Sequence, residues 1–363
     1  ALALDGTVQS AGSTTLQAVG ALDNSAKVIA AGPLEEDAAS LRNAQGAAFS
    51  SGADAQLRTG GVLENAGSLY AANALQINAD SFTQGGSVSS GNTLSATVVD
   101  TFDNTGNVVA RNALQIDASH LRSSGQLGSE AAGVVLGSQG DIALQGVVAA
   151  ATNLQATAAG DLQQAGSLKA QSLALRAGHD LTASGTLQSA STFDLQAQRA
   201  LTFAAQGQAG GDIGMRAATL TTSQDAVLQG AGAIALDSGT IYSRGKLDAG
   251  SGLRVRSLGD LTLAGVAQGS GDVELTATGA LTNAAQVFAG RTLTAQAHSL
   301  ENAAAGVLAG DGDVALTAAA QLNNAGRVQA AGDLQMTAAS LDQSGSASAG
   351  RISVGTAGTA MGR

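Results

Sequence analysis

The chain has 363 residues, with 49 Gly, one Pro (Pro33), no Cys, no Trp and two Tyr, Tyr70 and Tyr242. Aromatic residues make up 2% of the sequence, whereas a globular core of this size is normally filled by large rings. The net charge is −11 without Lys or Arg clusters, which excludes an electrostatic binder of nucleic acid or heparin. The lack of Cys excludes disulfides and thiolate metal sites.

Export and membrane signals are missing from these residues. No apolar run approaches the roughly 18 residues that cross a bilayer, so we expect no membrane insertion. No basic-then-apolar signal peptide follows Ala1, and we expect any export signal to lie outside this sequence.

Internal repeats dominate the sequence. Residues 63–81 (LENAGSLYAANALQINADS), 102–120 (FDNTGNVVARNALQIDASH) and 322–340 (LNNAGRVQAAGDLQMTAAS) align without gaps, and residues 281–299 differ mainly at the glycine. Their shared pattern is apolar-x-Asn-x-Gly-x-apolar-x-Ala-x-x-x-Leu-x-apolar-x-Ala. All constrained positions have the same parity, which indicates the alternation of half-buried strands.

Weaker copies of this pattern fill the remaining sequence. Their first apolar residues recur every 18 to 22 residues, about 20 on average. Helical repeats need about 33 residues or more, and a mid-repeat glycine costs a helix roughly 1 kcal/mol, so a helical solenoid is excluded. We place the coil starts at Leu4, Leu22, Leu41, Leu63, Phe82, Phe102, Leu121, Ile142, Leu162, Leu181, Leu201, Leu220, Ile241, Leu261, Leu281, Leu300, Leu322 and Leu341.

One unit of this length holds two or three short strands and their turns, which is one coil of a parallel β-helix. The sequence therefore predicts an all-β solenoid of about 18 coils of about 20 residues, forming a single domain over residues 1–363. Alternate residues should point inward and stack on like residues of the next coil. In one coil the predicted inward set is Leu63, Leu69, Ala71, Leu75, Ile77 and Ala79, stacking on Phe82, Val88 and Leu94.

Asn and Gly in the repeat indicate turns. Asn tolerates left-handed backbone conformations and can bond neighbouring backbone groups, and stacked Asn side chains can bond one another between coils. Positive φ is expected at the glycines that follow. A second turn signal is Gly-Asp before an apolar residue, as at Gly160-Asp161, Gly259-Asp260 and Gly332-Asp333. The Asn and Gly residues concerned are Asn65, Asn104, Asn283, Asn302, Asn324, Gly67, Gly106 and Gly326.

The pattern in LENAGSLYAANALQINADS resembles the repeats of the filamentous haemagglutinin family, large exoproteins of Gram-negative bacteria exported by two-partner secretion. The resemblance covers essentially the whole chain. It implies a right-handed parallel β-helix, export through an outer-membrane β-barrel transporter, and display at the cell surface. Similar repeats form the stick of contact-dependent growth inhibition toxins.

The sequence departs from the family at its ends. The amino-terminal secretion domain that would engage the transporter has an Asn-Pro motif, and the only proline here is Pro33. A toxin-like carboxy-terminal domain is also missing. We therefore interpret the chain as a fragment of a longer exoprotein shaft.

Residues able to carry chemistry are few, and we expect no catalytic, cofactor or metal site. His120 and His298 fall near the ends of their repeats at turn positions, and His179 is isolated. Gly210-Gly211-Asp212-Ile213 and Asp311-Gly312-Asp313-Val314 come nearest to a calcium-binding β-roll, but neither recurs at nine-residue spacing.

Two charged runs stand out. Glu35-Glu36-Asp37 is interpreted as a polar loop that bulges from the coil, with a partner or cation contact as the alternative. Arg254 and Arg256 are interpreted as a solvated strand face, with Asp248 and Asp260 near in sequence.

Enzymes with this architecture need clustered carboxylates in a cleft, usually with aromatic residues, and this sequence shows neither, so we expect no enzyme. The leading hypothesis is the shaft of a secreted adhesin that mediates or spaces attachment to host glycans or surface proteins, with an unknown binding surface. The alternative is the stick of a toxin-delivery exoprotein. A glycan-degrading enzyme is the third class.

Overall fold

The computed structural model describes residues 1–356, which divide into two compact units, Ala1–His179 (unit 1) and the residues from Asp180 onward (unit 2). All regular structure in residues 1–356 is strand. The predicted all-β class is therefore confirmed. The single-domain organisation over residues 1–363 stays a prediction.

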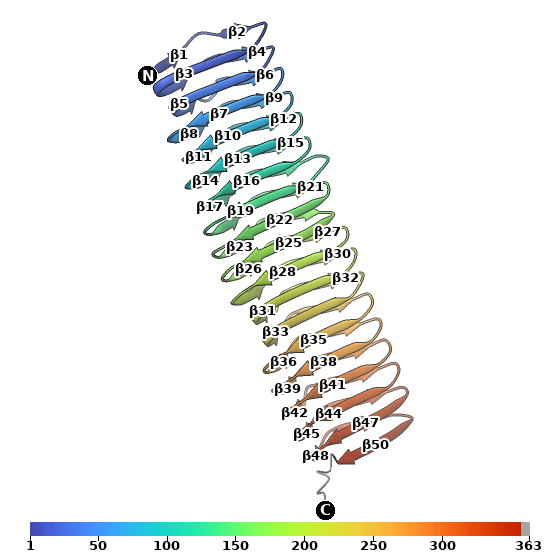
Figure 1. Ribbon diagram of the computed structural model, residues 1–363. Coiled ribbons are helices and arrows are strands. Elements are labelled where there is room, and N and C mark those ends of the chain that lie inside the picture. The colour runs from blue at the N-terminus through green and yellow to red at the C-terminus, as the bar shows by residue number, and fades with distance from the viewer. Residues whose placement is uncertain (357–363) are drawn as a thin grey trace, which may run out of the picture. The chain divides into compact units, whose positions relative to one another are not determined.

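Each coil contains three strands separated by short turns. In unit 1, β9 (Ser68–Ala71), β10 (Leu75–Ala79) and β11 (Ser81–Gln84) form one coil. These strands pair in parallel with the corresponding strands of the next coil, β12, β13 and β14, so the backbone hydrogen bonds run between coils (Figure 1). We call the positions of β9, β10 and β11 the first, second and third face.

Unit 1 contains nine strands on its first face, and β3 and β5 each run continuously over the second and third faces. The first face comprises β2 (Val8–Ser10), β4 (Lys27–Ala30), β6 (Ala48–Ser51), β9, β12 (Ser87–Ser90), β15 (Asn107–Ala110), β18 (Gln126–Ser129), β21 (Val147–Ala150) and β24 (Ser167–Ala170). The second face comprises β7 (Ala55–Thr59), β10, β13 (Leu94–Val98), β16 (Leu114–Ala118), β19 (Val134–Ser138), β22 (Asn153–Ala158) and β25 (Ser172–Ala177). The third face comprises β1 (Leu2–Leu4), β8 (Val62–Asn65), β11, β14 (Thr101–Asn104), β17 (His120–Ser123), β20 (Ile142–Leu144) and β23 (Leu162–Gln164), and the continuous strands are β3 (Thr14–Asn24) and β5 (Leu34–Asn43).

Unit 2 repeats this plan, also with nine first-face strands among its described residues. They are β27 (Thr186–Ser189), β30 (Gln206–Ala209), β32 (Val227–Gly230), β34 (Lys246–Ala249), β37 (Ala267–Gly269), β40 (Gln286–Ala289), β43 (Val307–Gly310), β46 (Arg327–Ala330) and β49 (Ser346–Ser348). The second face comprises β28 (Phe193–Ala197), β35 (Leu253–Ser257), β38 (Val273–Ala277), β41 (Leu293–Ala297), β44 (Val314–Ala318), β47 (Asp333–Ala338) and β50 (Arg351–Thr356). The third face comprises β26 (Leu181–Ala183), β29 (Ala200–Phe203), β36 (Leu261–Leu263), β39 (Ala280–Asn283), β42 (Ser299–Asn302), β45 (Gln321–Asn324) and β48 (Ser340–Gln343), and the continuous strands are β31 (Ile213–Thr222) and β33 (Ile234–Ser243).

The predicted coil starts occupy one register position on the third face. Phe82 pairs with Leu63 on one side and Phe102 on the other, and the series continues in both units. One start is wrong: Leu2, rather than Leu4, pairs with Leu22. Leu2 and Leu4 have the same parity, so alternation alone does not choose between them.

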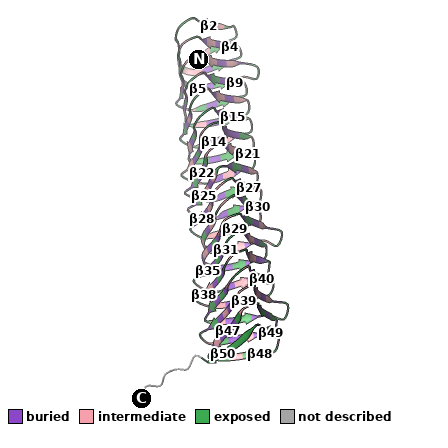
Figure 2. Cartoon of the chain, turned by 90° about the vertical axis from the view of Figure 1, so that its right-hand side faces the viewer, coloured by how far each residue is buried: buried purple, intermediate pink, exposed green. Residues whose placement is uncertain are grey.

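Inward residues form the core of each unit, as predicted. Leu63, Leu69 and Ile77 are fully buried, and buried and exposed residues alternate along single strands (Figure 2). Val134 and its neighbour Val135 in β19 illustrate the alternation, with 0% and 36% of their surfaces exposed. Burying each such aliphatic side chain contributes about 1.5–3 kcal/mol, and the core needs the coils on either side to cover it.

The repeated asparagines end third-face strands beside a turn and bond the turn backbone, as predicted: Oδ1 of Asn104 accepts a hydrogen bond from the backbone N–H of Gly106 at 3.1 Å. Asn43 and Asn65 end third-face strands and are buried, and the amide Nδ2 of Asn43 donates to Oδ1 of Asn65 at 2.8 Å. In unit 2 Nδ2 of Asn302 donates to Oδ1 of Asn324 at 2.7 Å and to the Arg327 carbonyl oxygen at 3.2 Å. The expected bonding between stacked Asn side chains is therefore confirmed, and it satisfies amides that burial would otherwise leave unpaired.

The glycines after these asparagines are required by close packing, not by positive φ. Among the described residues only Gly46 has a positive φ. A Cβ on Gly67 would lie 2.3 Å from the Ala47 carbonyl oxygen and 2.8 Å from Nδ2 of Asn43. The previous coil leaves no room for a side chain at this corner.

Candidate functional site

A polar hollow lies on the outer side of the third face in unit 1. Asp103 on β14, Arg122 on β17, Ala143 on β20 and Gln163 on β23 occupy one register position on four successive coils. The methyl group of Ala143 stands between two long side chains. It leaves an open hollow of about 380 Å³, which we call the third-face hollow.

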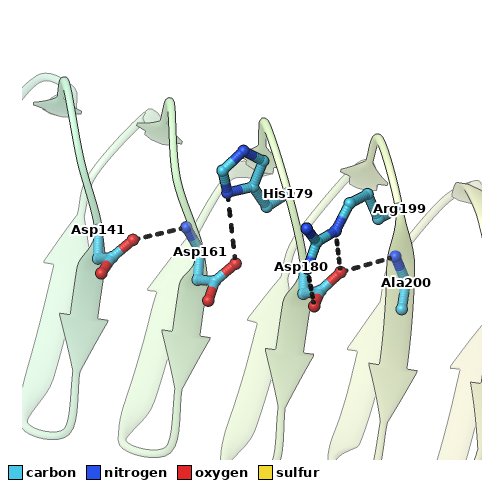
Figure 3. A network of polar contacts seen from close by, with 6 residues as sticks. All are labelled: Asp141, Asp161, His179, Asp180, Arg199 and Ala200. Carbon is cyan, nitrogen blue, oxygen red and sulfur yellow. Dashed lines mark hydrogen bonds and ion pairs between the residues drawn. The ribbon is translucent and has the colours of Figure 1, made fainter.

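Two aspartates line the hollow where the chain enters the third-face strands. Oδ1 of Asp141 accepts a hydrogen bond from the backbone N–H of Asp161 at 2.8 Å, and Oδ1 of Asp161 lies 4.0 Å from Nδ1 of His179 (Figure 3). A Cβ on Gly160 would lie 2.2 Å from Oδ1 of Asp141. Glycine therefore leaves room for the aspartate of the preceding coil, which explains the Gly-Asp pairs as a structural signal.

The same arrangement recurs in unit 2. Oδ1 of Asp180 accepts from the backbone N–H of Ala200 at 3.1 Å, and Oδ2 of Asp180 forms an ion pair with Nη2 of Arg199 at 2.9 Å (Figure 3). Oδ1 of Asp260 accepts from the Ala280 N–H at 2.8 Å. These carboxylates supply acceptors to backbone groups at the start of strands.

The third-face hollow was not predicted. The guanidinium of Arg122, the amide of Gln163 and three aspartate carboxylates line one open space. Such groups form hydrogen bonds with hydroxyl-rich ligands. In the sequence, each of these residues looks like an ordinary surface residue. Aligning the residue after each coil start would have shown the small Ala143 between Arg122 and Gln163.

The predicted histidine positions are exposed. His120 begins β17 in unit 1, and His298 lies between β41 and β42 in unit 2. His179 lies at the end of unit 1 beside Asp161. Within residues 1–356 no three His, Asp or Glu side chains are grouped so as to hold a metal ion.

The two calcium-like stretches use their aspartates as backbone acceptors. Oδ1 of Asp212 accepts from the N–H of Ala233 at 2.8 Å, and Oδ1 of Asp313 accepts from the N–H of Asp333 at 2.8 Å. Both aspartates immediately precede second-face strands. Like Asp141 and Asp161 they lie just before a strand, but on the second face rather than the third.

The prediction of a polar loop at Glu35-Glu36-Asp37 is wrong. These residues belong to β5, where Glu35 and Asp37 point to solvent and Glu36 is buried between Leu16 and Leu57 of the adjacent coils. Leu34 and Ala38 fix the inward parity of the strand, so Glu36 must point inward with them.

The arginines and tyrosines lie on outer faces. Arg254 and Arg256 point outward from β35, as predicted, and Nε of Arg254 lies 3.8 Å from Oε2 of Glu274 on the next coil. Asp248 instead forms an ion pair with Lys246, whose ammonium hydrogen-bonds its carboxylate and lowers the Asp248 pKa. Tyr242 lies under the guanidinium of Arg244, 5.3 Å from the ring centroid, in a cation–π contact.

Comparison with known proteins agrees with this architecture. The family model of the haemagglutinin repeat matches residues 1–67, 30–82, 70–146, 123–215, 210–265, 266–335 and 329–361. No curated protein and no solved structure matches the chain significantly. In the described part of the chain no helix is long and apolar enough to span a membrane.

The matches leave almost no residue uncovered. They confirm the resemblance to filamentous haemagglutinin, and this family together with the fold is that of a structural repeat protein of adhesin type. The chain belongs to the haemagglutinin-repeat family.

Proposed function

We propose that the chain is part of the shaft of a secreted bacterial adhesin and that it mediates or spaces attachment to host glycans or surface proteins. The observation that carries this proposal is the recurrence of one three-strand coil throughout each unit. Each added coil extends the stack while the inward residues maintain it. The outward residues make little contribution to the core and are free to vary for binding.

The third-face hollow is the candidate contact with a glycan. Arg122 can donate from a planar guanidinium, and Asp103 can accept from sugar hydroxyl groups. The hollow contains no aromatic ring, so we expect weak binding that becomes effective only through many copies on one surface.

Export through a two-partner-secretion transporter and display on a Gram-negative surface are part of the proposal. They are supported by membership of the haemagglutinin-repeat family. The transporter would engage a secretion domain of the exoprotein.

Beads coated with the purified chain test the adhesive role. We expect them to attach to cultured host cells and to be displaced by the soluble chain. The double variant R122A/Q163A should attach less, whereas R254A, an outward arginine of unit 2, should attach normally. Attachment no greater than that of albumin-coated beads would refute the adhesive role of this chain.

A deletion tests the role as a spacer. Removing residues 64–82 joins Leu63 to Thr83 and keeps the register, because Leu63 and Phe82 are paired residues. We expect this variant to fold and to attach normally. Deleting residues 64–73 shifts the register and should prevent folding of unit 1.

The stick of a toxin-delivery exoprotein is the alternative, and it has the same fold. The carboxy-terminal sequence of the intact precursor separates the two. A compact toxin-like terminal domain encoded beside an immunity gene would favour toxin delivery. A polysaccharide-degrading enzyme would instead release new sugar ends from a polysaccharide panel, which we do not expect.

A further inference from the structure

Glu36 is a buried acid without a hydrogen-bond partner. Only 1% of its surface is exposed, and neither carboxyl oxygen has a hydrogen-bond partner. It lies on the second face between Leu16 of β3 and Leu57 of β7. A carboxylate in such surroundings is strongly disfavoured relative to the neutral acid.

The charged residues of the surrounding strands do not compensate for this burial. All of them point outward and are exposed, and β6, which also contacts β5, has none. They are Asp23 on β3, Glu35, Asp37 and Arg42 on β5, Arg58 on β7 and Glu64 on β8. Asp37, the next residue along the strand, further disfavours a second negative charge.

These surroundings determine the titration of Glu36. Burial raises its pKa from 4.5 to about 8, and the nearby backbone amide of Arg58, which forms no hydrogen bond of normal geometry with the carboxyl, offsets only part of this effect. In the unfolded chain the same carboxyl ionises near its ordinary pKa. Because the folded-state pKa is the higher one, closed coils are favoured most below pH 4.5, and this advantage is lost as the pH rises toward 8.

We propose that Glu36 makes the stacking of β3, β5 and β7 dependent on pH. With its carboxyl protonated the three strands stay closed, and its ionisation favours local opening of these coils. The opening equilibrium changes by up to tenfold per pH unit, or about 10³-fold between pH 4.5 and 8. This part of unit 1 would therefore be tightest in acid and loosest in alkaline surroundings. The proposal does not depend on the adhesive function.

Thiol labelling measures this opening directly, because the chain has no Cys. A55C places a thiol at a buried position of β7, and A277C places one at an equally buried position of β38 in unit 2. Each thiol reacts with an aromatic disulfide reagent only when its coils open. The ratio of the two labelling rates removes the pH dependence that all thiols share.

We expect the ratio for A55C over A277C to rise at least 100-fold between pH 5 and 8.5. In the E36L background the ratio should stay constant. E36Q keeps the shape of the side chain without titration, so it should also be flat, and it serves if E36L alters packing. E35Q removes the neighbouring exposed carboxyl and should leave the rise unchanged. A constant ratio with Glu36 present, or an unchanged rise in both E36L and E36Q, would overturn the proposal.

Discussion

Strands β5 in unit 1 and β33 in unit 2 occupy corresponding places, and each runs continuously over two faces. At the same inward position β5 has Glu36 between Leu16 and Leu57, whereas β33 has Leu236 between Met215 and Val255. Both residues are 1% exposed. Pairing on both sides and the parity of neighbouring residues therefore hold a strand in register even when one inward residue is an acid. The acid then makes stability depend on pH.

The largest effect is expected from transferring the acid to unit 2. Leu236→Glu loses the burial of a leucine and buries a carboxyl, which should cost about 4 kcal/mol at neutral pH. Ala235→Glu introduces the same residue on the outward side, beside Arg254, and should change stability by less than about 0.5 kcal/mol. Urea unfolding followed by circular dichroism measures both. Equal losses would contradict the assigned strand faces.

The reverse change should stabilise unit 1. Glu36→Leu removes the cost of keeping an acid neutral, which is about 3 kcal/mol at pH 7, from a raised pKa of about 8. At pH 5 the gain should shrink to about 1 kcal/mol, because this pH lies only half a unit above the ordinary pKa of 4.5, so that protonating the carboxyl costs much less free energy. Urea unfolding at the two pH values checks this, with Glu35→Leu as the exposed control. A gain independent of pH would show that packing alone is responsible.

The stacked asparagines at the ends of third-face strands offer a third contrast, and we call them the amide ladder. In unit 2 the same register position is an amide at Asn302 and apolar at Leu263. Asn302→Leu leaves Oδ1 of Asn324 without its donor and removes one of the three acceptors of Nδ2 of Asn283, which keeps the carbonyl oxygens of Ala285 and Val307. We expect a loss of about 2 kcal/mol. Glu301→Leu, on the outward side of the same strand, should be close to neutral. Thermal unfolding of the two variants compares them, and a stabilised Asn302→Leu would argue that the ladder can be replaced by apolar stacking.

The smallest effect concerns the aspartates that begin strands in both units. Asp141→Ala removes the acceptor of the Asp161 N–H, and Asp260→Ala removes that of the Ala280 N–H. Because both sites are open to water, which can replace the acceptor, each loss should be about 0.5–1 kcal/mol. Amide hydrogen exchange should accelerate locally at the freed N–H. Unchanged exchange there would contradict the role assigned to these carboxylates.

Much of the fold could be predicted because the spacing of the large apolar residues, and their alternation with polar residues, can be read directly from the sequence. Leu63, Phe82 and Phe102 are large, apolar and regularly spaced, so their stacking follows from the sequence. Asn65 shares their parity and therefore points inward as well, and its place beside a turn also follows from its chemistry. The prediction for Glu36 is wrong because its charge indicates exposure to solvent, whereas the parity of Leu34 and Ala38 places it inward.

The candidate site was harder to predict, because it depends on what the outward residues of several coils do together. Ala143 is unremarkable until Arg122 and Gln163 are placed on either side of it. Outward residues do not repeat, so their pattern carries no period. The small size of one residue and the length of its neighbours create the third-face hollow.

Cross-linking tests the register between coils. Tyr70 and Ser89 are outward partners on β9 and β12, and paired strands lie about 4.8 Å apart, within the range of a disulfide. The Y70C/S89C pair should oxidise rapidly to a disulfide in the folded protein, whereas Y70C/S95C, which joins the first face of one coil to the second face of the next, should stay reduced. Equal oxidation of both pairs, or oxidation of the second alone, would contradict the stacking of coils in this register.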